Sequence, residues 1–184
     1  MQKVNKFKVV IGVVLGAAFF LVGFVQNKIS PRLQQKLNAA VQTTFEVENF
    51  DLLVMPVSGT VNTKTPVELG SENLFEVKKN DSLIGYIYLG RAPSMKNVFD
   101  YVVLFNPDLS IKKSKVLIYR EDYGRQIGSQ RWLKQFIGKK SGDHLTYGED
   151  VDAISGATIS AKSMTKATNE VLESFAILHA EKVL

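Results

Sequence analysis

An uncharged run near the N-terminus places the strongest constraint on what this chain can fold into. Residues 9–25 read VVIGVVLGAAFFLVGFV, seventeen positions without a charge, and three lysines lie among the eight residues before them. Such a run is typical of a membrane anchor or a signal peptide. It is long for a signal peptide, and the QNKIS that follows contains neither an A-x-A pattern nor a lipobox cysteine. We therefore expect an uncleaved single-pass anchor over residues 1–28.

The remainder of the 184-residue chain is long enough for one domain with one hydrophobic core. The net charge of +5 is scattered among acidic residues, so we expect a solvated surface and no nucleic-acid binding. The chain has no cysteine, which excludes disulfides, Fe–S clusters with cysteine ligands and covalently attached c-type haem. His144 and His179 are far apart in the sequence, and we expect no metal site. Redox chemistry here requires an organic cofactor.

Hydrophobic periodicity predicts an α+β fold, with an N-terminal transmembrane helix followed by a small domain of mostly antiparallel sheet and flanking helices. Ser30 and Pro31 are typical of a helix start, and apolar residues recur on one face of the connecting helix that we expect within 29–50. Residues 52–69 contain prolines and a glycine and indicate a loop or a pair of short edge strands. Four strands are expected at 74–78, 83–89, 101–105 and 111–119, and two helices at 130–137, ended by Gly138, and about 160–180.

The segment before the last predicted helix reads DAISGATIS and has the features of a phosphate site. Ser155, Gly156 and Ala157 are small enough for close backbone approach, and the hydroxyls of Thr158 and Ser160 stand where the helix begins. Free backbone amides and the positive end of the helix dipole favour a phosphate there. Serine and threonine are also ordinary N-caps, so a simple helix-capping turn remains an alternative.

Residues 152–158 resemble the flavinylation motif D-x-x-[S/T]-G-A-T of the FMN-binding domain family, and all five specified positions match. That family includes the anchored FMN-carrying subunits of the sodium-pumping NADH:quinone oxidoreductase and of the Rnf-type ferredoxin:NAD oxidoreductase. Its redox-complex subunits usually read E-T-P-G-x-G further upstream. Glu121 and Gly124 fit that pattern, whereas Asp122, Tyr123 and Gln126 depart from it, so the chain resembles a divergent or single-domain member.

The resemblance implies a covalent flavin. In the family, a flavin transferase uses FAD as donor, the motif threonine attacks the pyrophosphate, AMP leaves, and FMN stays as a phosphoester. The acceptor here would be Thr158, and Asp152 would help present the motif to the transferase. The residues implied in cofactor binding are Thr158 (covalent FMN), Asp152, Ser155, Gly156, Ala157, Ser160, Glu121 and Gly124. Candidates for a wall beside the flavin ring are Trp132, Phe136, Tyr123 and Tyr147.

The implied function is a membrane-anchored electron-transfer flavoprotein in an extracytoplasmic or respiratory redox chain, a carrier or complex subunit without catalytic residues of its own. The implied domains are an anchor (1–28), a connecting helix (29–50) and an FMN-binding domain (51–184). We expect a single pass through the cell membrane, with the soluble domain on the periplasmic side. Expected partners are the membrane, the flavin transferase, and redox partner proteins or quinone-reductase-type subunits.

Two alternatives remain at this point. One is an anchored non-redox scaffold or assembly module, in which the SGAT segment is only a helix-capping turn and the protein is colourless. The other is an extracytoplasmic reductase that uses the same FMN to reduce a small-molecule acceptor directly. The sequence contains no second nucleotide fingerprint and no nucleophile–base constellation that would favour the reductase.

Overall fold

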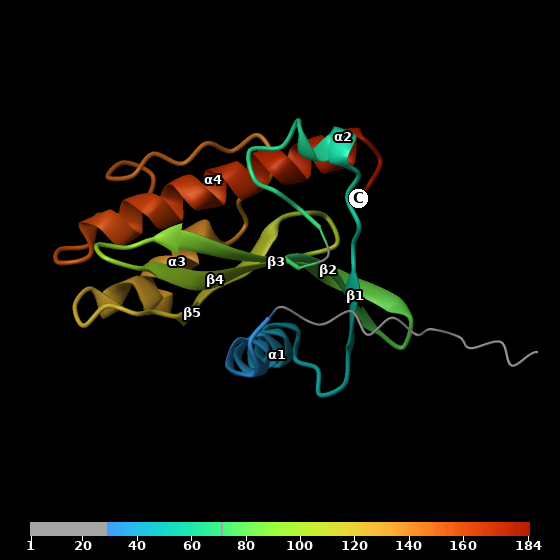
Figure 1. Cartoon of the computed structure of the whole chain (residues 1–184), viewed down its shortest axis with the longest axis horizontal. Helices are drawn as coiled ribbons and strands as arrows, with labels where there is room; N and C mark the ends of the chain where they lie inside the picture. The colour runs from blue at the N-terminus through green and yellow to red at the C-terminus, as the bar shows by residue number, and fades with distance from the viewer. Residues whose placement is uncertain (1–28, 71) are drawn as a thin grey trace, which may run out of the picture.

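An antiparallel sheet forms the centre of the molecule, and helices cover both of its faces (Figure 1). The computed structural model describes residues 29–70 and 72–184. The predicted anchor over residues 1–28 lies outside these residues. Within the described part of the chain, no helix has the length and apolar character needed to cross a membrane.

The sheet has five strands in the spatial order β1-β2-β3-β4-β5, and each strand is antiparallel to its neighbour. The strands are β1 (Asp51–Val54), β2 (Leu74–Lys79), β3 (Ser82–Pro93), β4 (Val98–Phe105) and β5 (Ile111–Ile118). Short links join β2 to β3, β3 to β4 and β4 to β5, whereas residues 55–73 lie between β1 and β2. The link between β2 and β3 is a two-residue turn of Asn80 and Asp81, in which both residues have positive φ. The predicted α+β class, the four strands and their antiparallel pairing are confirmed.

The structure extends the predictions at two places. Strand β3 continues to Pro93, because its second half pairs with β4 out to the Pro93–Val98 pair. The run Gly90 to Pro93 has low strand propensity, so only the partner strand makes it extended. The segment 52–69, for which a loop or a pair of short edge strands was expected, contains most of the edge strand β1 and a short helix, α2 (Gly59–Asn62).

Helix α1 (Pro31–Phe45) packs on one face of the sheet and forms a layer of the domain. Ser30 caps it by accepting a hydrogen bond from the Leu33 amide at 3.3 Å, and Glu46 ends it in the left-handed conformation. The buried stripe of α1 belongs to one cluster with apolar side chains of β2, β3, β4 and β5. This second, separate core consists of Leu33, Leu37, Ala40, Val41, Phe75, Val77, Ile87, Leu89, Val102, Leu104 and Leu117.

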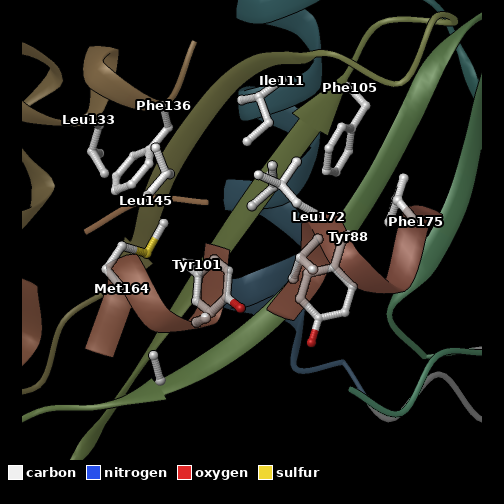
Figure 2. Packing of buried hydrophobic residues seen from close by; sticks show 14 of the residues in the cluster. Tyr88, Tyr101, Phe105, Ile111, Leu133, Phe136, Leu145, Met164, Leu172 and Phe175 are labelled. Atoms are coloured by element: carbon white, nitrogen blue, oxygen red, sulfur yellow. The ribbon is translucent and has the colours of Figure 1, made fainter. Parts of the chain in front are cut away.

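Helix α4 (Thr158–Ala180) covers the opposite face, and Figure 2 shows its side chains against those of the strands. The rings of Phe105 and Phe175 stack with centroids 4.1 Å apart. The predicted apolar stripe is buried throughout: Met164, Ala167, Val171, Leu172, Phe175 and Leu178. The 3.6-residue period of the sequence therefore identified the correct face of the helix.

The helix predicted over 130–137 is shorter in the structure. Helix α3 (Gln130–Leu133) passes into a 3-10 turn, η2 (Lys134–Phe136), and Ile137 is extended. The reason is a backbone interaction with the start of β5: the Gly138 amide donates to the Ile111 carbonyl, and the Ile111 amide donates to the Lys139 carbonyl, each at 2.7 Å. These bonds end the helix before the predicted cap. An earlier 3-10 turn, η1 (Arg125–Gly128), links β5 to α3.

Candidate flavin-attachment site

The start of α4 has no side-chain cap. Its N-cap residue is Ala157, which makes no side-chain cap, whereas Ser30 and Ser58 cap α1 and α2. The first helical bond joins the Ala161 amide to the Ala157 carbonyl at 2.9 Å. In the part of the chain that the structure describes, the amides at 158–160 have no hydrogen-bond acceptor. A 23-residue helix therefore presents its positive end to solvent.

The three hydroxyls of the motif have different environments. Thr158 is exposed at the first helical position, and its hydroxyl makes only a 3.5 Å contact with the Ile154 carbonyl. Ser155 is exposed as well. Ser160 is buried, and its hydroxyl pairs with the Tyr119 hydroxyl at 2.9 Å. None of the three caps α4, so the alternative of a helix-capping turn lacks the hydrogen bond that would define it. This hydrogen bond joins α4 to the residue that follows β5.

Main-chain contacts hold the loop before Thr158 in place. The Asp152 amide donates to Gln135 Oε1 at 2.9 Å, and the Asp152 carbonyl accepts from Trp132 Nε1 at 2.7 Å. The Asp152 residue is otherwise exposed. Gly156 is also exposed and has a φ of +76°. The loop is thus fixed through its backbone, which leaves the Asp152 carboxylate and the Thr158 hydroxyl accessible to another molecule.

Gly124 brings a second segment against the motif. It has a φ of +77°, and a Cβ at this position would lie 2.9 Å from the Tyr119 hydroxyl and 3.0 Å from the Gly156 carbonyl oxygen. Any other residue would be strained in this conformation and would push the two segments apart. The sequence prediction that Gly124 belongs to the site is consistent with this close approach to Gly156 and Ala157.

Glu121 lies next to a different loop. Its carboxylate accepts hydrogen bonds from the Ser94 hydroxyl at 2.6 Å and from the amides of Lys96 and Asn97 at 2.7 and 2.9 Å. The Ser94 bond, followed by the Lys96 amide bond, lowers the pKa of Glu121 to about 2. These contacts join the segment after β5 to the β3–β4 turn.

A buried carboxylate that no sequence pattern singled out holds the same segment. Asp100 on β4 is 1% exposed and pairs with Arg120 Nη2 and, at 3.1 Å, with Arg91 Nε. Arg120 Nη1 also donates to the Val98 carbonyl at 2.9 Å. Arg91 lies on β3, Asp100 on β4, and Arg120 follows β5. The β3–β4 register places Arg91 opposite Asp100.

The four aromatic candidates for a flavin wall are not equivalent. Trp132 and Phe136 are buried in the main core, where their rings meet edge to face at a centroid distance of 5.3 Å. Tyr147 is partly buried, and Lys162 Nζ lies 5.7 Å from its ring centroid. Tyr123 alone among the four is exposed. The structure therefore leaves Tyr123 as the accessible aromatic side chain of this set.

A shallow groove of about 420 Å³ borders the loop before Thr158. It runs between the α3 region and residues 152–154. Its lining is Gln126, Ser129, Arg131, Trp132, Lys134, Gln135, Asp152, Ala153 and Ile154. Charged, amide and hydroxyl side chains make up most of this lining.

Comparison with known proteins defines the class of domain. Residues 96–173 match the model of the FMN-binding domain family, and this range contains β4, β5, the motif and most of α4. The resemblance seen in the sequence is thereby confirmed: this part of the chain is a domain of the FMN-binding family.

One solved structure supports the fold independently. NqrC from Shewanella oneidensis is similar with a TM-score of 0.55 and 16% sequence identity, over 74% of this chain and 90% of that chain. At this level of identity, the similarity concerns the fold. No curated protein is similar enough in sequence to be matched to the chain.

The residues at the start of α4 fit the phosphate of FMN. Free amides, the helix dipole and an exposed hydroxyl coincide at Thr158, and the small residues before it leave the approach open. The backbone amides at the start of α4 and the Thr158 hydroxyl provide this geometry.

Proposed function

We propose that this chain is a membrane-anchored electron-transfer flavoprotein that holds FMN as a phosphoester on Thr158. The observation that carries the proposal is the exposed Thr158 hydroxyl at the uncapped start of α4, inside the segment that matches the FMN-binding family. FMN would supply the electron chemistry, which the side chains of this protein lack.

The attachment step requires one hydroxyl and one activated phosphate. Thr158 Oγ1 would attack the flavin-side phosphorus of FAD, with cleavage of the P–O–P bond, release of AMP and transfer of the hydroxyl proton to a base of the transferase. The Thr158, Ile159 and Ser160 amides would hold the phosphate oxygens, and the helix dipole would favour the remaining negative charge.

Asp152 would serve as a recognition residue for the transferase. Its backbone is fixed by Gln135 and Trp132, and the residue is exposed a few positions before Thr158. A carboxylate held in this way gives the transferase a charged feature at a constant place relative to the acceptor hydroxyl.

Residues 1–28 would anchor the domain to the cell membrane, with the domain on the periplasmic side. A covalent link has a clear purpose outside the cytoplasm, because a flavin that dissociated there would be lost. The electron donor and acceptor would be membrane-associated redox proteins or subunits of a quinone-reductase-type complex.

Intact-mass measurement tests the proposal. The full chain, co-expressed with a flavin transferase of proven activity, should gain the mass of FMN minus water, and Thr158→Ala should abolish the gain completely. Ser141→Ala is the matched control, since it removes an exposed hydroxyl that lies outside the motif. A colourless wild-type chain without added mass would contradict the proposal and favour the non-redox scaffold.

A further inference from the structure

Three large apolar side chains are exposed around Thr158. Met95 in the β3–β4 turn is 73% exposed, Tyr123 after β5 is 86% exposed, and Ile159 in the first turn of α4 is 52% exposed. We call these three residues the apolar platform. Single exposed apolar residues are common, but a group drawn from separate segments indicates a contact surface.

Hydrogen bonds and packing bring the three segments together. Glu121, two residues from Tyr123, accepts from the hydroxyl and amides of the turn that contains Met95. Gly124, next to Tyr123, packs on Gly156 and Ala157.

A third link joins α4 to the same turn. The Ser163 hydroxyl donates to the carbonyl of Pro93 and to that of Ile159, one turn earlier in the helix. Figure 1 shows the result: the β3–β4 turn, the segment after β5 and the start of α4 meet at one end of the molecule.

We propose that the apolar platform seats the isoalloxazine ring of FMN. The inference rests on the proposed attachment at Thr158 and deepens it by naming the residues beneath the ring. Ile159 directly follows the attachment point, and Met95 and Tyr123 belong to the segments that surround it. A flat aromatic ring stacks favourably on a tyrosine, and methionine sulfur contacts aromatic rings favourably. Tethered on Thr158, the ring covers apolar surface that water otherwise contacts.

The neighbouring groove is the competing location for the ring. It borders residues 152–154, and most of its lining residues have charged, amide or hydroxyl side chains. Its one aromatic residue, Trp132, is largely buried and uses its indole N–H to hold the Asp152 carbonyl. The platform contains an exposed aromatic ring, that of Tyr123, whereas the aromatic ring in the groove is buried.

The test uses the full FMN-loaded chain and its Tyr123→Ala and Met95→Ala variants. Visible circular dichroism and flavin fluorescence anisotropy report whether the ring is held. We expect Tyr123→Ala to lower the ratio of held to free ring by roughly two- to tenfold, the range that one aromatic contact provides. Met95→Ala should shift both signals in the same direction by a smaller amount.

Two controls fix the interpretation. Ile137→Ala removes an exposed apolar side chain elsewhere, and Gln126→Ala alters the groove, so both should leave the flavin signals unchanged. Unchanged signals in Tyr123→Ala and Met95→Ala, or a change in Gln126→Ala alone, would overturn the inference. Intact mass is measured on every sample, so a failure of attachment at Thr158 is distinguished from a ring that is attached but lies elsewhere.

Discussion

Glu121 joins two loops through a single oxygen. Its Oε1 accepts all three hydrogen bonds from the β3–β4 turn, and the family pattern that singled out this glutamate gave no indication of that partner. Since each bond favours the ionised carboxylate, the folded protein lowers its pKa from 4.5 to about 2. The position of Tyr123 and Gly124 depends on this attachment.

The Glu121 carboxylate makes stability depend on pH in a defined direction. Its pKa is lower in the folded state, so its contribution is complete above pH 4.5 and is lost as the pH falls from there toward 2. Glu121→Gln should lower the urea midpoint at neutral pH, and the difference from wild type should shrink at about pH 3. Glu173→Gln, on the exposed side of α4, is the control. A Glu121→Gln deficit that is equal at both pH values would contradict this account.

Helix α4 differs from α1 in how it begins. The Ser30 side chain satisfies an amide of α1, whereas the Ala157 side chain satisfies none of α4. The free amides at a helix start bind side chains, water or a ligand, and no side chain serves at the start of α4. Helix α4 contributes more residues to the main core than any other element, and its uncapped N-terminus provides the proposed attachment site.

A phosphoester at Thr158 should therefore stabilise α4. We expect the FMN-loaded chain to exceed the unloaded chain in free energy of unfolding by about 0.3–1 kcal/mol from the helix-dipole interaction, and this increment should fall with added salt. Urea unfolding of both forms at low and high salt measures the difference. Thr158→Ala, treated identically with the transferase, provides the baseline. A loaded chain that is no more stable than the unloaded chain would show that the phosphate lies away from the helix start.

The whole domain consists of a sheet with a separate core on each face. Helix α4 covers the main core, and α1 covers the second. The segment that looks like a linker in the sequence therefore contributes to the stability of the folded domain. Since α1 directly follows the predicted anchor, the domain would be held to the membrane through a packed element.

Substitutions in both cores test this arrangement. Leu37→Ala in α1 and Phe175→Ala in α4 remove fully buried side chains, and we expect losses of about 2–5 and 3–5 kcal/mol respectively. Ile137→Ala, at an exposed position, should change stability by less than about 0.5 kcal/mol. Urea unfolding followed by two probes should show one transition in each variant. An unaffected midpoint in Leu37→Ala would mean that α1 is only a tether.

Local pattern in the sequence determined the elements and the motif. Alternating and β-branched residues identified four strands, a 3.6-residue period identified the buried face of α4, and a short stretch of small and hydroxyl residues identified its start. These features depend on neighbours within a few positions. For that reason the sequence predicted the α+β class and the antiparallel pairing, and the family match confirmed an FMN-binding domain.

Contacts between distant residues decided the rest. The burial of Ser160 against Tyr119, the attachment of Glu121 to the β3–β4 turn, and the early end of the helix before Gly138 each depend on a partner from another element. The grouping of Met95, Tyr123 and Ile159 around Thr158 is of the same kind. Spacing along the chain contains no information about such pairs, because the packing of α4 and the loops on the sheet brings them together.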